Sequence, residues 1–510
     1  MKNRASSDKN NQYFRTEHLK TDLKGRSVRG GAVTLGAQSV KFCLTLGSNV
    51  VLARLLTPQD YGLVGMVTVV TGLVAIFKDL GLSAATVQKE EINHQQVSTL
   101  FWVNVALGIV TMLVTVAIAP VIAWFYQEPR LFWITLSLGS GFIISGLGVQ
   151  HSALLNRQMQ YKALTINEIV SVTIGIGSAI VAARFGLGYW ALVILPLVTG
   201  IVSTVGLWTV CSWRPSLPAR QSGVRSMLVF GGNLTGFNIV NYFARNLDNL
   251  LIGKVWGAQQ LGLYAKAYQL LLLPLQQING PFQKVAIPAL SRLVDSPERY
   301  RQAYLRILEK LTIITAPLVV FMIATSDWIV LLLLGPQWID ATPIFSLLGI
   351  AAFTQPVANT TGWLFITQGR TNHMFQWGIV GSILSATAIV FGVQWGAIGV
   401  AASYSISGLL IRTPILFWYV GRSGSVKGRD LYRTMAPSTL ASLWSLCVLL
   451  VSRQWLGIFH PIISLTIAFL INIAITLLVL IALPAGRAAL QDFKNLIPLI
   501  TKRKSENSAS

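Results

Sequence analysis

The sequence predicts an all-α polytopic membrane protein, and three properties of the chain support that fold class. Only 11% of the 510 residues are charged, whereas ordinary soluble proteins carry about 25%. Hydrophobic residues make up 53% of the chain, which leaves too little polar surface for the roughly three soluble domains that its length would suggest. The apolar residues also gather in runs of about 20, the length that a helix needs to cross a bilayer core.

Fourteen apolar runs are the candidate transmembrane helices, taken in chain order. The last pair is the weakest, so counts of twelve or thirteen stay open. The segment 327–334 is too short to span alone, and the basic segment 290–310 is expected to form a short helix on the membrane surface. The expected limits of the spans are 31–56, 61–81, 97–124, 131–155, 163–184, 187–212, 226–253, 260–289, 311–330, 341–367, 373–393, 395–420, 434–452 and 462–483.

The basic residues predict the orientation of the spans. With the N-terminus placed in the cytoplasm, 29 of the 40 Lys and Arg fall in inner segments and five in outer ones. Such an excess is typical of cytoplasmic loops. We therefore expect a basic cytoplasmic N-terminus (1–30), a cytoplasmic tail (484–510) and a multi-pass membrane protein. The net charge of +22 then marks topology and gives no reason to expect a nucleic-acid partner.

An internal repeat with an offset of 200 residues predicts two lobes. VLARLLTPQDYGL at 51–63 aligns with LIGKVWGAQQLGL at 251–263, with identical Gln, Gly and Leu at three positions. Both segments end one span and begin the next, and they stand six spans apart. Hence two parallel six-helix lobes (31–212 and 226–420) are expected, followed by two extra helices (434–483). Transporters commonly place the cargo site between such repeats.

Two spans, equivalent in the repeat, each carry polar residues on one helix face. The spacings of 3 and 4 residues put each set on a single stripe. A charge near the bilayer centre costs about 2.5–3.5 kcal/mol on insertion scales, so the stripes should face inward, toward each other or a wet cavity. The stripes are Gln38, Lys41, Thr45 and Ser48 in the first span and Asn238, Asn241, Arg245 and Asp248 in the seventh.

Cations outnumber acids inside the predicted spans, so a central cavity should suit an anionic cargo. Other interpretations stay open. Arg245 and Asp248 stand three residues apart and can neutralise one another. The remaining intramembrane charges near the inner interface can be purely structural; they are Glu168, Lys284 and Arg412.

The sequence offers no signal for an enzyme. It has no GxxxxGK[ST] phosphate loop, and its five histidines and three cysteines lack metal-ligand spacing. We therefore expect no catalytic residues, no metal site and no cofactor.

Four landmarks, in this order and spacing, resemble the polysaccharide-exporter flippases. They are LARLLTPQDYGLVGM (52–66), FKDLGLSAATVQ (77–88), LDNLLIGKVWGAQQLGLYAKAYQL (247–270) and IPALSRL with SPERYRQAYL (287–305). The resemblance is to the Wzx type, nearest to exporters of colanic-acid-like polysaccharide, within the multidrug, oligosaccharidyl-lipid and polysaccharide exporter superfamily. It implies a protein of the bacterial inner membrane that translocates undecaprenyl-pyrophosphate-linked oligosaccharide units across it by alternating access, driven by an ion gradient.

That resemblance suggests roles for the polar residues. Lys41, Arg245, Lys266 and Lys284 would attract the pyrophosphate or acidic sugars. Gln38, Asn238 and Asn241 would hydrogen-bond sugar hydroxyls, and Asp248 or Glu168 would take the coupling ion. Membrane lipids, a polysaccharide polymerase and assembly proteins are the expected partners. The alternatives are a peptidoglycan-precursor flippase, a multidrug exporter of the same superfamily and a scaffold protein without transport.

Overall fold

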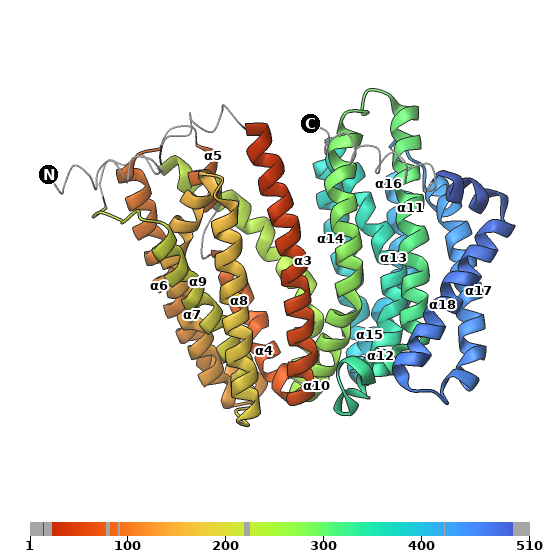
Figure 1. The fold of residues 1–510 in the computed structure, drawn as a ribbon, viewed down its shortest axis with the longest axis horizontal. Helices are drawn as coiled ribbons and strands as arrows, with labels where there is room; N and C mark the ends of the chain where they lie inside the picture. The colour runs from red at the N-terminus through yellow and green to blue at the C-terminus, as the bar shows by residue number, and fades with distance from the viewer. Residues whose placement is uncertain are drawn as a thin grey trace. The chain divides into compact units, whose positions relative to one another are not determined.

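The computed structural model describes residues 14, 23–77, 82–89, 92–218, 225–422 and 424–492. Every regular element in these ranges is helical, which confirms the predicted all-α fold class (Figure 1). The chain divides into two compact units, Met1–Gly262 and Leu263–Ser510. The border between the units lies five residues after the kink at Gly257 in α10 (Arg225–Ser291), and the limits of the two predicted lobes remain a prediction.

The described residues of unit 1 form eight helical elements and the first part of a ninth. Four contacts build it: α6 packs on α7, α8 on α9, α7 on α9 and α3 on α8. The elements are α3 (Leu23–Leu55), α4 (Pro58–Val74), η1 (Ala75–Phe77), α5 (Leu82–Gln88), α6 (His94–Tyr126), α7 (Arg130–Arg157), α8 (Tyr161–Arg184), α9 (Trp190–Val210) and α10 (Arg225–Ser291).

Local sequence signals fix where the helices of unit 1 begin. Thr57 caps α4: its hydroxyl accepts from the N–H of Asp60, whose carboxylate accepts from the N–H of Thr57 at 2.9 Å. Asn93 and Gln96 form the same box at the start of α6. Such boxes satisfy N–H groups that have no partner inside the helix.

Helix α10 contains the turn that the repeat predicts. Gly257 has φ 78° and ψ −175°, a backbone conformation that only glycine adopts readily. It stands 200 residues after Thr57, where the chain turns from α3 into α4. Two helical stretches of α10 therefore meet at Gly257, between the predicted spans 226–253 and 260–289.

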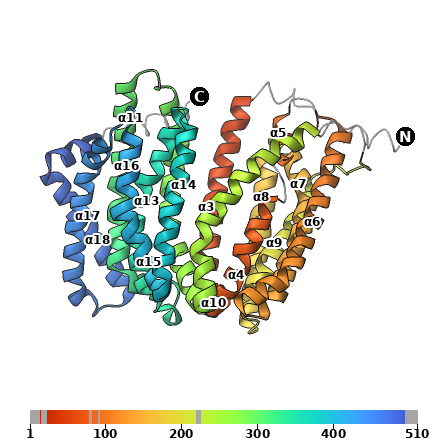
Figure 2. The same cartoon turned by 180° about the vertical axis from the view of Figure 1, so that it is seen from behind.

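The two copies of the repeated segment touch each other, and α4 lies beside α10 in both views (Figure 1 and Figure 2). A Cβ on Gly62 would lie 1.7 Å from the carbonyl oxygen of Ala258. A Cβ on Gly262 would lie 1.8 Å from the carbonyl oxygen of Pro58. The contact is reciprocal, because 58 and 62 correspond to 258 and 262 in the repeat. We call residues 58–62 and 258–262 the glycine seam.

Unit 2 contains the rest of α10 and the C-terminal helices. Its main contacts join α11 to α13 and α17, α17 to α18, α14 to α15, and α13 to α15. The elements are α11 (Pro297–Ala324), α12 (Ser326–Leu333), η2 (Pro336–Trp338), α13 (Ala341–Thr367), α14 (Thr371–Gly392), η3 (Val393–Trp395), α15 (Gly396–Ser407), η4 (Gly408–Arg412), α16 (Thr413–Gly421), α17 (Gly428–Leu456) and α18 (Pro461–Ala482).

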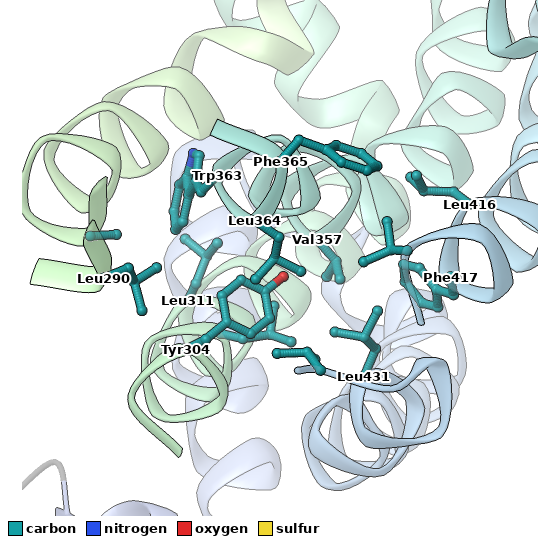
Figure 3. Close-up of a cluster of buried hydrophobic side chains, with 14 of the residues drawn as sticks. Leu290, Tyr304, Leu311, Val357, Trp363, Leu364, Phe365, Leu416, Phe417 and Leu431 are labelled. Atoms are coloured by element: carbon teal, nitrogen blue, oxygen red, sulfur yellow. The ribbon is translucent and has the colours of Figure 1, made fainter. Parts of the chain in front are cut away.

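The core of unit 2 overturns the expected surface helix at 290–310. Helix α11 starts at Pro297 and continues unbroken to Ala324. One face of its first turns is buried: Tyr304 is 0% exposed, its hydroxyl lies 2.7 Å from that of Thr360, and its ring points into the apolar cluster with Leu311 and Leu431 (Figure 3). Burial of the aromatic face therefore draws this basic segment into the helix bundle.

By length and hydropathy, nine helices in the described ranges could cross a membrane. One of these continuous segments, Thr371–Gly421, has 51 residues and covers two predicted spans. The predicted count of fourteen spans remains a prediction.

Candidate functional site

An ion pair joins two helices of unit 1, α3 and the candidate membrane span α8. The ammonium of Lys41 on α3 donates to the carboxylate of Glu168 on α8. The two side chains are 38% and 53% exposed, so the pair lies at a surface of the unit. Against lipid, such exposed charges would be costly. We therefore expect this face of α3 and α8 to be in contact with water rather than with lipid.

The pairing also sets the depth of Lys41 in the bundle. Glu168 stands seven residues after Tyr161, the start of α8, which is about 10 Å along the helix. Lys41 is level with that second turn. Gln38, one turn earlier on α3, is exposed, whereas Ser48 near the other end is only 8% exposed. The polar stripe of α3 thus passes from an exposed surface into the packed core.

The stripe of α10 is only partly described. Arg245 is exposed, and Asp248 is 7% exposed with an oxygen 2.8 Å from the N–H of Asn249. The ion pairs found among the described residues do not include Arg245 with Asp248. The side chains of Asn238 and Asn241 lie outside the described part of the structure.

The last two predicted cargo residues belong to unit 2. Lys266 is buried, with 4% exposure, and Lys284 is exposed on the same helix, α10. Among the predicted site residues, the structure joins Lys41 to Glu168. The roles assigned to the others stay predictions.

A cavity of about 810 Å³ lies between α5, α7 and α9 of unit 1. This volume is in the range of small-molecule sites, about 300–1,000 Å³. The lining contains no ionisable side chain. Its polar groups are hydroxyls and amides, namely Ser83, Gln88, Ser145, Ser152, Asn156, Ser203 and Thr204.

Two polar contacts hold the walls of this cavity in place. Asn167, the neighbour of Glu168 on α8, donates to the hydroxyl of Ser203 at 3.3 Å and to its carbonyl at 3.1 Å. Arg157 is 6% exposed and donates to carbonyls at the end of α5, among them that of Thr86 at 3.3 Å. The ion pair and the cavity wall thus depend on adjacent residues of α8.

Sequence reasoning missed this cavity, although one signal was present. Small residues recur on one face of α7 at Gly141, Ser145, Gly148 and Ser152. That spacing alone does not distinguish close helix packing from an open cavity, because the outcome depends on α5 and α9.

A second cavity, of about 230 Å³, lies within unit 2 between α13, α14 and the helices around η4. Arg412 is the one charged residue in its lining. The sequence indicated only that this arginine lies near the inner interface.

Comparison with known proteins adds the family. A family model described as "Polysaccharide biosynthesis protein" matches residues 51–343, more than half of the chain. The chain belongs to this family. The match begins at the repeated segment that forms the glycine seam, and it confirms the resemblance found in the sequence.

Several relatives of this polysaccharide biosynthesis protein are similar over most of their length. The lipopolysaccharide biosynthesis protein WzxC of Escherichia coli is 27% identical over 78% of this chain and 81% of its own. The teichuronic acid biosynthesis protein TuaB of Bacillus subtilis is 28% identical over 75% and 78%. The succinoglycan biosynthesis transport protein ExoT of Rhizobium meliloti is 24% identical over 78% and 81%.

Similar solved structures show to which known fold this protein corresponds. The lipid II flippase MurJ superposes with a TM-score of 0.66 at 14% identity, over 89% of this chain and 98% of MurJ. An inward-facing multidrug transporter of the MATE family gives 0.59 at 14% identity, over 77% and 95%. The fold is therefore that of membrane transporters and flippases.

Proposed function

We propose that the protein translocates lipid-linked oligosaccharide units across the bacterial inner membrane by alternating access. The observation that carries the proposal is the fold, which this member of the polysaccharide biosynthesis family shares with a lipid II flippase. The exposed ion pair of Lys41 and Glu168 on α3 and α8 adds to it. A relative named as a transport protein, ExoT, supports transport as the family's task.

The Lys41–Glu168 pair supports a charge-exchange step. A pyrophosphate or acidic sugar that binds Lys41 replaces the carboxylate of Glu168. An unpaired carboxylate among spanning helices is unfavourable, so Glu168 then binds a proton or a sodium ion. Cargo binding and ion binding therefore favour one another, because each breaks the same ion pair and frees the residue that the other binds.

The cavity of unit 1 supports binding of the sugar part of the cargo. Hydroxyls and amides without charge suit sugar hydroxyls, which both donate and accept hydrogen bonds. Gln38, exposed one turn from Lys41, serves the same purpose in this proposal. Asn238, Asn241, Arg245, Lys266, Lys284 and Asp248 keep the roles predicted from the sequence.

The proposal includes a location and partners. Both termini are cytoplasmic, as the distribution of basic residues predicts. A polysaccharide polymerase and other assembly proteins take over the flipped units. The protein itself catalyses no covalent change.

Replacement of Lys41 tests the proposed function in a flippase-null strain that supplies the matching oligosaccharide. We expect Lys41→Ala with Arg245→Ala to lower polymer export by about tenfold or more, because each removes a charge-assisted contact worth about 1.5–3 kcal/mol. Glu168→Gln should bind cargo but lose its dependence on the ion gradient. Lys162→Ala, an exposed lysine at the start of α8, is the matched control and should export normally.

Intact export by the Lys41→Ala, Arg245→Ala protein overturns these residue roles. Drug resistance conferred by the wild-type protein, with no effect on polymer, would reassign it as a multidrug exporter. Rescue of a peptidoglycan-flippase mutant would reassign it as a flippase of peptidoglycan precursors.

A further inference from the structure

The cavity of unit 2 is built around one guanidinium group. Arg412 ends η4, a π-helical turn between α15 and α16. π-Helical turns occur frequently at functional sites. The lining also contains polar side chains of α13, namely Thr354, Gln355 and Asn359, and the aromatic residues Tyr268, Trp377 and Tyr404.

Neighbouring residues hold the guanidinium of Arg412 in one position. Its Cζ lies 4.4 Å from the centre of the Tyr404 ring, and Nη1 donates to the hydroxyl of Ser385 on α14. Gly408, one turn earlier, leaves room for it, because a Cβ there would lie 3.1 Å from Nη2. The group is thus oriented before any ligand binds, which lowers the entropic cost of binding.

This oriented charge has no acidic partner in the described part of the chain. The ion pairs found there do not include Arg412, and the cavity lining contains no carboxylate. Charges within proteins are normally paired. The amides of Gln355 and Asn359, four residues apart on one face of α13, add N–H donors to the same cavity.

We propose that this cavity is an anion subsite, in which Arg412 binds a phosphate or carboxylate group of the cargo. The inference rests on the proposed function and deepens it. A guanidinium has five N–H donors in a planar fork that matches both groups. The hydroxyl of Ser385 accepts from Nη1, which leaves further N–H donors of the guanidinium for an anion. The ring of Tyr404 restrains the guanidinium, and the side-chain amides of Gln355 and Asn359 offer further N–H donors to the anion.

Binding to the purified full-length protein in lipid nanodiscs tests the subsite. The probes are undecaprenyl pyrophosphate, undecaprenol as its uncharged counterpart, and glucuronic acid as a sugar carboxylate. We expect Arg412→Gln to weaken binding of undecaprenyl pyrophosphate by about tenfold or more and to leave undecaprenol binding unchanged. Arg412→Lys keeps the charge but loses the fork, so it should restore binding only in part.

A matched control is available ten residues further on. Arg422 is exposed, and its guanidinium lies over the ring of Trp418 at 5.7 Å, but it does not line the cavity. Arg422→Gln should bind all probes normally. Gln355→Leu is a second test that keeps Arg412 and fills the cavity, and it should weaken anion binding as well.

The outcomes separate the subsite from the proposed function. If Arg412→Gln weakens binding of glucuronic acid alone, the anion is an acidic sugar, and the subsite stands. Wild-type binding that neither Arg412→Gln nor Gln355→Leu changes overturns the subsite and leaves the flippase proposal intact. A wild-type protein that binds no anionic probe overturns both.

Discussion

The glycine seam and the cavity of unit 1 differ in what surrounds their glycine residues. At the seam, Gly62 and Gly262 bring two backbones so close that even a methyl group would overlap a carbonyl oxygen. At the cavity, Gly141 and Gly200 meet only side chains, and an added Cβ would lie 3.5–3.6 Å from its nearest neighbour. Glycine thus permits a close backbone contact at the seam and leaves open space at the cavity.

The difference shows that a glycine must be judged by what its missing side chain would meet. Backbone atoms cannot move aside without shifting a whole helix, whereas a leucine or isoleucine side chain can change rotamer. We therefore expect the seam to be intolerant of substitution and the cavity glycines Gly141 and Gly200 to be tolerant.

Substitution in the seam has the largest expected effect on this comparison. Gly62→Ala or Gly262→Ala should lower the free energy of unfolding by about 3 kcal/mol, the upper part of the range for overpacking, because the carbonyl of Ala258 or Pro58 must move. Thermal unfolding of the purified protein measures the change. Gly65→Ala on the same helix is the control: its Cβ would lie 3.5 Å from the Leu261 side chain, so stability should stay the same or rise. Equal stability of Gly62→Ala, Gly262→Ala and Gly65→Ala would show that the close backbone contact at the seam does not restrict substitution.

Filling the cavity should impair transport while leaving the fold intact. Ser145→Leu places a larger side chain in the cavity of unit 1, so we expect polymer export to fall by about tenfold, the result of losing roughly 1.4 kcal/mol of cargo binding. Ser137→Leu lies on the same helix outside the cavity lining and should export normally. Undiminished export by Ser145→Leu would show that the cavity takes no part in transport.

The smallest effect is expected for a cavity glycine. The new Cβ of Gly200→Ala would lie 3.5 Å from a methyl group of Ile144, an ordinary contact. Since alanine favours a helix over glycine by about 1 kcal/mol, the unfolding temperature should rise slightly and export should stay within about twofold. A loss of stability as large as that of Gly62→Ala would contradict the comparison.

Features that depend on neighbouring positions in the chain could be predicted from the sequence. Hydropathy placed the helices, and the offset of 200 residues located the turn at Gly257 as the equivalent of Thr57. Contacts between distant helices could not be predicted. Glu168 stands 127 residues from Lys41, and only the packing of α3 on α8 makes it the partner of that lysine.

The surface helix predicted at 290–310 failed for a similar reason. Charge suggested a position on the membrane surface, but the buried face of Tyr300, Tyr304 and Leu308 could be recognised only once its neighbours on α13 were known. The cavity around Arg412 likewise combines residues of α10, α13, α14 and α15 with the turn η4. No single segment carries enough information to predict it.

The seam has a consequence for how the two halves of the chain can diverge. Its reciprocal contact is of the kind that two identical lobes would make across a two-fold axis. In a single chain the two copies of the segment mutate separately. Each seam glycine is nevertheless constrained by backbone atoms of the other copy: Gly62 by Ala258, and Gly262 by Pro58. The three identities between 51–63 and 251–263 all fall at or directly beside the seam, at positions 59, 62 and 63 and their equivalents. A substitution in one copy of the repeated segment is therefore tolerated only where the backbone of the other copy leaves room for it.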